Sequence, residues 1–151
     1  MSEPLTDFSL AALLAQARQG GAIQPLIDAL PYARFLRLEV ARDDAGLVTT
    51  MRYHDELIGD ASIPALHGGS LAGLLESAAV LEVLLDAGTQ ALPKTITLTI
   101  DYLRSGRAID TRARARVVRK GRKVAVIESR AYQDDPTKPV ATAIVHVLLA
   151  G

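Results

Sequence analysis

Residues 66–88 read LHGGSLAGLLESAAVLEVLLDAG, in which a His-Gly-Gly motif leads into about five turns of mostly apolar sequence. The apolar residues occupy every side of the expected helix, so the helix has to be buried on every side. Gly88 follows as a C-terminal stop signal, and interruption by serine and glutamate makes a membrane span a poor fit. The stretch predicts a helix over 68–85 at the centre of a globular core.

The sequence after this helix alternates between polar and apolar residues, as expected for strands with one buried face. Strands are predicted at 94–103, 109–119, 122–132 and 140–149, and two more upstream at 35–41 and 47–53. The turns at 120–121 and 134–136 are short, which predicts an antiparallel meander in the second half of the chain. One long buried helix on a curved antiparallel sheet of about six strands is an α+β fold.

The N-terminal part reads as helical. A first helix is predicted over 7–19 and ends at Gly20-Gly21, and a second runs over 23–30 and stops at Pro31. Residues 54–66 read as a loop. We therefore expect a helical extension over 1–30 and a single domain over 31–151.

Composition narrows the class of protein. The chain has 151 residues, 17 basic and 17 acidic side chains and no cysteine, which excludes a disulfide framework and a thiolate metal site. Zero net charge argues against nucleic acid or membrane as a partner. The first four residues lack the basic start of a signal peptide, so we expect a cytoplasmic protein.

Positive charge is concentrated in one segment. Residues 104–123 hold nine basic side chains and one acidic one, whereas residues 1–103 hold 6 basic and 13 acidic. Arg112, Arg114 and Arg116 alternate along one strand face, which is typical of a solvated surface. The turn residues Arg104, Arg107, Arg119 and Lys120 are better candidates for an anionic ligand.

The start of the long helix and one carboxylate within it could carry chemistry. Gly68 and Gly69 leave backbone N–H groups uncovered at the positive end of the helix dipole, where an oxygen that gains charge in acyl transfer would be stabilised. Glu76 lies two turns further on the same side, among Ala72, Gly73, Ala79 and Val80. A tight turn and a structural ion pair are the alternative interpretations of these two features. His67 and Ser70 have weaker individual claims, and the three histidines show no metal-binding spacing.

Together these residues resemble a known family. His67-Gly68-Gly69, Glu76 nine residues after the histidine, and Leu98–Arg104 (LTIDYLR) resemble the hotdog-fold acyl-CoA thioesterases of the phenylacetate-degradation type. The resemblance spans roughly residues 25–149. It implies a hotdog fold, a homodimer or homotetramer with a shared active site, and hydrolysis of acyl-CoA. No metal or separate cofactor is implied, because coenzyme A is part of the substrate.

The resemblance also implies roles for individual residues. The Gly68 N–H would polarise the thioester carbonyl, Glu76 would act as nucleophile or general base, and Thr95 would help to place water. Asp60 is the nearest candidate for an asparagine that the family has before the motif, and His67 completes the expected catalytic group. Contacts to coenzyme A are expected from Gly69, Ser70, Arg104, Arg107, Arg119 and Lys120. Two alternatives remain open: a non-catalytic acyl-CoA binding protein, and a hotdog hydratase or dehydratase.

Overall fold

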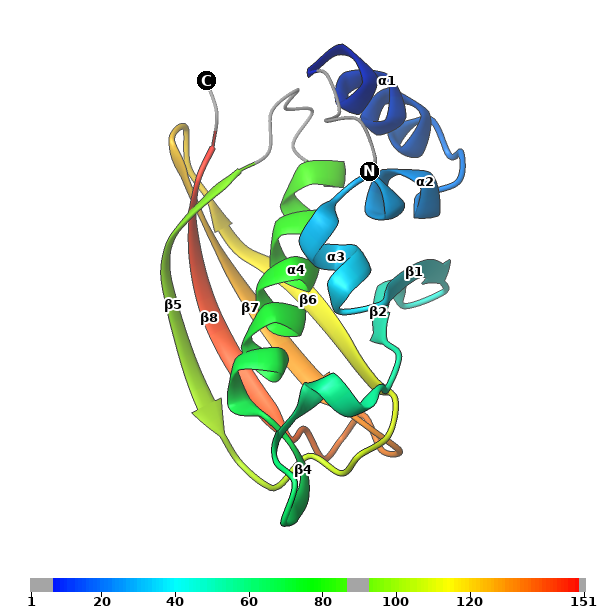
Figure 1. Ribbon diagram of the computed structural model, residues 1–151. Helices are drawn as coiled ribbons and strands as arrows, with labels where there is room; N and C mark the ends of the chain where they lie inside the picture. The colour runs from blue at the N-terminus through cyan, green and yellow to red at the C-terminus, as the bar shows by residue number, and fades with distance from the viewer. Residues whose placement is uncertain (1–6, 87–92, 150–151) are drawn as a thin grey trace.

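A central helix lies across the concave face of a curved sheet in the computed structural model, which describes residues 7–86 and 93–149 (Figure 1). The helix is α4 (Gly68–Asp86). The sheet is antiparallel, with strand order β1-β2-β6-β7-β8-β5. Its strands are β1 (Leu38–Asp43), β2 (Gly46–Met51), β5 (Lys94–Tyr102), β6 (Thr111–Lys120), β7 (Val124–Tyr132) and β8 (Ala141–Leu148). The predicted α+β class and six-stranded sheet are confirmed.

Small side chains let α4 approach the sheet closely. Ala113, Ala131 and Ala143 face the helix from three neighbouring strands and are almost fully buried, and Ile127 and Val145 fill the space between them. Alternation sends the other residues of these strands to the opposite face.

The opposite face carries the predicted arginine row. Arg116 lies across from Glu128 and pairs with it at 2.6 Å, and Glu128 also accepts a hydrogen bond from Arg130. The hydrogen bonds from these two arginines hold the pKa of Glu128 below its usual value. Arg114 pairs with Asp43. The interpretation of this row as a solvated, ion-paired strand face is therefore confirmed.

The predicted four-strand meander is wrong in one respect. Strands β6, β7 and β8 do form a meander, but β5 lies at the far edge of the sheet and pairs with β8. The connection from β5 to β6, residues 103–110, is too long for a tight hairpin, so the two strands need not be neighbours. The alternation of polar and apolar residues could not show this, because it indicates which face of the sheet each residue is on and not which strand pairs with which.

The N-terminal segment contains three helices: α1 (Asp7–Arg18), α2 (Gln24–Asp28) and α3 (Pro31–Phe35). Pro31 was interpreted only as a helix stop, but proline is well suited to the first turn of a helix, where its missing N–H has no partner anyway. Helix α3 therefore includes Phe35, the first residue of the predicted strand, and β1 begins at Leu38 instead of residue 35.

The predicted loop over 54–66 is also more ordered than expected. It holds a short 3-10 helix, η1 (Asp55–Leu57), and a hairpin of β3 (Ile58–Asp60) and β4 (Ile63–Leu66). Each strand is too short for alternation to be recognised. The hairpin leads directly into the start of α4.

The far end of α4 is joined to α1. The Arg18 guanidinium donates two hydrogen bonds to the Leu84 carbonyl oxygen, at 3.0 Å and 2.5 Å, where the last carbonyls of a helix have no partner within it. The expected stop at Gly88 lies outside the described residues. Helix α4 is long and apolar enough for a membrane span, with a mean hydropathy of 1.5, but 56% of that window is buried in the fold, as in a core helix.

Candidate active site

The first turn of α4 leaves one backbone N–H available. Ser70 and Leu71 donate their N–H groups to the His67 carbonyl oxygen, and Gly69 donates its N–H to the His67 ring at 2.8 Å. Within residues 7–86 and 93–149, the Gly68 N–H has no acceptor. This free donor lies at the positive end of the helix dipole. It is the group that the sequence analysis selected to polarise a carbonyl.

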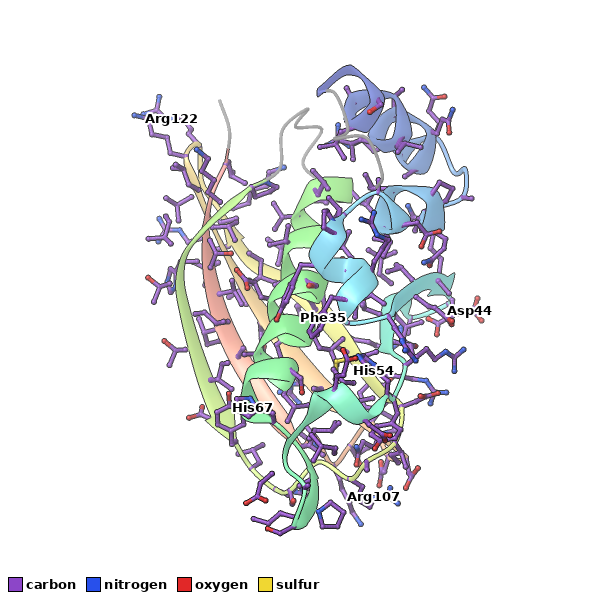
Figure 2. The ribbon with its side chains drawn as sticks, viewed as in Figure 1. Phe35, Asp44, His54, His67, Arg107 and Arg122 are labelled. Atoms are coloured by element: carbon purple, nitrogen blue, oxygen red, sulfur yellow. The ribbon has the colours of Figure 1, made fainter. Side chains whose placement is uncertain are left out.

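The His67 ring supports this turn of backbone. Its Nδ1 accepts the Gly69 N–H, so the proton of the neutral ring is on Nε2. The ring also packs against Gly59 of β3, where an added Cβ would approach its Cδ2 to 2.5 Å. Figure 2 shows His67 at the lower end of α4. His67 therefore holds the start of the helix in shape, and its Nε2–H is left as a donor.

Three cavities follow one another along the open side of α4. The start cavity, about 650 Å³, is lined by Gly68, Gly69, Tyr102 and Arg104 among others. The middle cavity, about 400 Å³, is lined by Tyr32, Phe35, His67, Gly69 and Ser70 among others. The aliphatic cavity, about 310 Å³, is lined by Ile27, Leu30, Pro31, Tyr32, Ala33, Leu38, Glu76, Ser77, Val80, Leu81 and Pro93. Gly69 and His67 line both of the first two, and Tyr32 lines both of the last two.

Glu76 is half-buried and faces the aliphatic cavity. It stands on the side of α4 that also carries Gly69 and Gly73, so it lies two turns from the helix start, as the spacing predicted. None of the ion pairs found among the described residues involves Glu76. No described cation therefore supports the alternative interpretation of Glu76 as half of a structural ion pair.

Tyr32 is a site residue that the sequence analysis missed. Its ring lies over Gly73, where an added Cβ would come within 3.1 Å of the Tyr32 hydroxyl oxygen. Tyr32 thus stands between Glu76 and Gly69, and it stacks on Phe35, which in turn meets the edge of His54. Phe35 and His54 lie beside each other in Figure 2. The signal in the sequence was a pair of aromatic residues three apart after a proline, in a chain with only 4% aromatics.

The predicted coenzyme A contacts separate into two groups. Arg104 lines the start cavity beside Gly68, and Arg107 is nearby in sequence but pairs with Asp134. Arg119 and Lys120 lie at the other end of β6, a strand of ten residues and so about 33 Å long. Figure 2 shows the same separation between Arg107 and Arg122. A single chain therefore does not bring the four basic residues together.

Neither Asp60 nor Thr95 lines the aliphatic cavity that Glu76 faces. The Asp60 carboxylate accepts hydrogen bonds from the Ser62 hydroxyl and N–H, which hold the pKa of Asp60 below its usual value and stabilise the β3–β4 turn. Thr95 is half-buried in β5, two residues beyond Pro93, which does line the aliphatic cavity. Ser70 is buried in the first turn of α4, where its hydroxyl donates to the His67 carbonyl oxygen.

Comparison with known proteins identifies the family. A family model described as the acyl-CoA thioesterase N-terminal domain matches residues 59–148. The chain belongs to this acyl-CoA thioesterase family. The resemblance found in the sequence is confirmed, as is the prediction of a thioester hydrolase. A search of the curated proteins gives no match.

Solved structures agree with the hotdog fold of this acyl-CoA thioesterase. A Chromobacterium violaceum protein is 34% identical with a TM-score of 0.74, over 91% of this chain and 96% of its own. A phenylacetic acid degradation-related protein of Ralstonia eutropha JMP134 is 24% identical with a TM-score of 0.71, over 91% and 99%. A Bacillus halodurans protein in a crystal structure with CoA is 21% identical with a TM-score of 0.73, over 96% and 91%.

Proposed function

We propose that this thioesterase hydrolyses acyl-CoA with the thioester carbonyl held at the Gly68 N–H and water activated by Glu76. The water oxygen attacks the carbonyl carbon while the Glu76 carboxylate takes its proton. The carbon–sulfur bond then breaks, the acid is released, and the coenzyme A thiolate takes up the proton that Glu76 had accepted, which restores the carboxylate. Negative charge that develops on the carbonyl oxygen is stabilised by the free N–H and the helix dipole. The step needs no metal or separate cofactor.

One observation carries this proposal: the Gly68 N–H and the Glu76 carboxylate, neither of them paired within the described part of the chain, lie on the open side of the same helix. Eight residues of helix separate them by about 12 Å along the axis. Helical side chains lean toward the N-terminus, which brings the Glu76 carboxylate closer to Gly68. The Tyr32 ring lies in the gap between them, over Gly73, and this exposed ring has to move for a thioester and one water molecule to occupy the gap. Because Gly73 carries no side chain, the helix itself does not obstruct this gap.

The start cavity is the proposed place for the coenzyme A part of the substrate. Arg104 is exposed there and, unlike Arg107, forms none of the ion pairs found among the described residues. The charge of Asp135 is close enough for Arg104 to help lower its pKa, but an exposed arginine outside an ion pair is still suited to a phosphate group. Coenzyme A bound in this way places its sulfur near Gly68.

Reversing the charge of Arg104 tests whether this residue binds coenzyme A. Arg104→Glu is expected to raise KM for acyl-CoA about tenfold and to leave kcat within about threefold, because a phosphate contact binds the ground and transition states alike. Arg122→Glu is the matched control, since Arg122 lies at the opposite end of the sheet (Figure 2). Steady-state kinetics at low salt give both constants. Equal KM values for the two variants would remove Arg104 from the binding site.

A second copy of the chain is proposed to complete the site. A sequence apolar on all sides was expected to be buried on all sides, yet Ala72, Glu76 and Val80 form a half-buried stripe on α4. The β1 edge of the sheet is occupied, because the Gln24 side chain donates to the Leu38 carbonyl oxygen and accepts from the Val40 N–H, both at 3.0 Å. The β5 edge has no such cover among the described residues. Open strand edges favour pairing with another chain.

We expect a homodimer, or a tetramer built from two such dimers, with β5 at the subunit interface. Light scattering at micromolar concentration measures the mass directly. A mass of at least about twice 16.1 kDa agrees with the proposal, and a monomer contradicts both the assembly and a shared site.

The alternatives give different products. A hydratase would convert crotonyl-CoA to its hydrated thioester without releasing thiol, and an acyl-CoA binding protein would leave both crotonyl-CoA and octanoyl-CoA intact. The proposed reaction releases thiol and the free acid in equal amounts. Chromatography of the products together with a thiol assay separates the three cases.

A further inference from the structure

We infer that the aliphatic cavity binds the acyl group, and that its size and lining select unbranched acyl chains of about eight to ten carbons. This inference rests on the proposed function, because it takes Glu76 to mark the place where the thioester is cleaved. It adds a substrate class and the residues that determine it.

The cavity is built by the N-terminal helices against α4. Ile27 comes from α2, and Leu30 is the residue just before α3. Ala33 comes from α3, and Val80 and Leu81 come from α4. These side chains are aliphatic, and the polar groups of the lining come from Tyr32, Glu76 and Ser77. An apolar ligand pocket with a few polar groups at one end fixes which end of the ligand reaches the surface.

The position of Glu76 orients the ligand. Glu76 and Ser77 line the same cavity as the aliphatic residues, one turn before Val80 and Leu81. An acyl chain whose thioester carbon lies beside the Glu76 carboxylate enters this cavity directly and ends between Val80 and Leu30. The reacting carbon then lies on the Glu76 side and the methyl end lies in the apolar part.

The volume sets the length of the chain. The cavity measures about 310 Å³, and a small group of methylene or water size occupies roughly 30 Å³ in the liquid, so about ten heavy atoms fit. Among the described residues, Tyr32 is the only aromatic residue in the lining, and its ring lies over Gly73, where the aliphatic cavity meets the middle cavity. No aromatic side chain lines the deep end to stack on a ring, so the cavity favours an aliphatic chain over an arylacetyl group.

Tyr32 controls the width of the mouth. It is 55% exposed and held by one stacking contact with Phe35, so its ring can swing away from Gly73 without opening the core. Its hydroxyl makes no hydrogen bond within residues 7–86 and 93–149. In the position seen here, the ring separates the aliphatic cavity from the middle cavity.

The test fills the cavity and measures chain-length preference. Val80→Phe places a ring in the deep part, and Ser77→Leu narrows the cavity from the neighbouring turn. Val126→Phe is the matched control, because Val126 is half-buried on the face of β7 opposite to α4. All three variants are first compared with the wild type by thermal unfolding, so that a loss of folding is recognised.

Thiol release is measured with butanoyl-, octanoyl-, dodecanoyl- and phenylacetyl-CoA. The wild type is expected to prefer octanoyl-CoA, by up to about 10²-fold in kcat/KM over butanoyl-CoA, since each buried methylene adds about fourfold. Val80→Phe is expected to lower kcat/KM for octanoyl-CoA at least tenfold and for butanoyl-CoA no more than threefold. Ser77→Leu changes the ratio in the same direction, and Val126→Phe leaves it unchanged. An equal effect on both substrates, or a preference for phenylacetyl-CoA that Val80→Phe does not alter, overturns the inference.

A binding measurement tests this inference independently of the proposed reaction. Octyl-CoA thioether cannot be hydrolysed, and its affinity relative to free coenzyme A is measured by calorimetry for the wild type and Val80→Phe. Suppose that the wild type releases no thiol but binds octyl-CoA at least tenfold more tightly than coenzyme A, and that Val80→Phe loses this gain in affinity. The proposed hydrolysis would then be rejected, and the acyl-binding site would be supported. Equal affinity for the two ligands rejects the acyl site.

Discussion

Glu76→Gln is expected to lower kcat for acyl-CoA hydrolysis by about 10²-fold or more while the protein keeps its fold. Glutamine preserves the shape of the side chain and its hydrogen-bonding capacity but cannot take a proton from water at neutral pH. The described residues supply no cation that pairs with Glu76, so removing its charge breaks no ion pair. The free energy of unfolding should therefore stay level or rise, because a half-buried carboxylate is costly to desolvate.

Thermal unfolding and thiol release measured on one preparation of Glu76→Gln separate chemistry from structure. The related residue Glu82, six residues further along α4, serves as a control. It is half-buried, burial and nearby Asp86 raise its pKa, and it does not line the aliphatic cavity. Glu82→Gln should retain normal turnover. Near-normal turnover in Glu76→Gln, with a loss of stability of about 3–5 kcal/mol, would instead mark Glu76 as half of a buried ion pair.

Gly68→Pro is expected to lower kcat by about 10²–10³-fold, because proline has no N–H to donate to the carbonyl oxygen. The first position of a helix tolerates proline, and the Gly68 N–H has no acceptor within the described residues to lose. The effect should appear in kcat more than in KM, since the hydrogen bond strengthens as charge develops on the oxygen.

Gly68→Ala is the matched control for this substitution. Both variants add a Cβ, which would lie 3.1 Å from the Tyr102 hydroxyl oxygen, so both displace the same exposed side chain. Only the proline variant loses the N–H. If alanine and proline lower kcat equally, crowding at Tyr102 explains the loss and Gly68 is not the oxyanion donor.

The elements that the sequence predicted well are those whose pattern is long and local. Residues 68–86 could be assigned from composition alone, and the strands of the second half from alternation, because one face of each packs on α4. The place of β5 beside β8 was not predictable in this way, since alternation does not specify a neighbour. Pro31 was misread because a proline both ends one helix and begins another.

The residues of the candidate site were predicted or missed for the same reason. Gly68 and Glu76 were found because both lie on one helix, where spacing in sequence gives spacing in space. Tyr32 was missed because it reaches Gly73 from a separate helix, and no local pattern reports that contact. Arg104 and Arg119 were grouped because they are near in sequence, yet a ten-residue strand places them at opposite ends of the sheet.

Product analysis on the wild-type protein with octanoyl-CoA tests the central claim most directly. Free thiol and octanoate are measured over the same time course, beside a reaction without protein. The account predicts that the two products form in equal amounts, at a rate that depends on protein concentration and far exceeds the uncatalysed reaction. Tight binding of octanoyl-CoA without thiol release above the uncatalysed rate would contradict it.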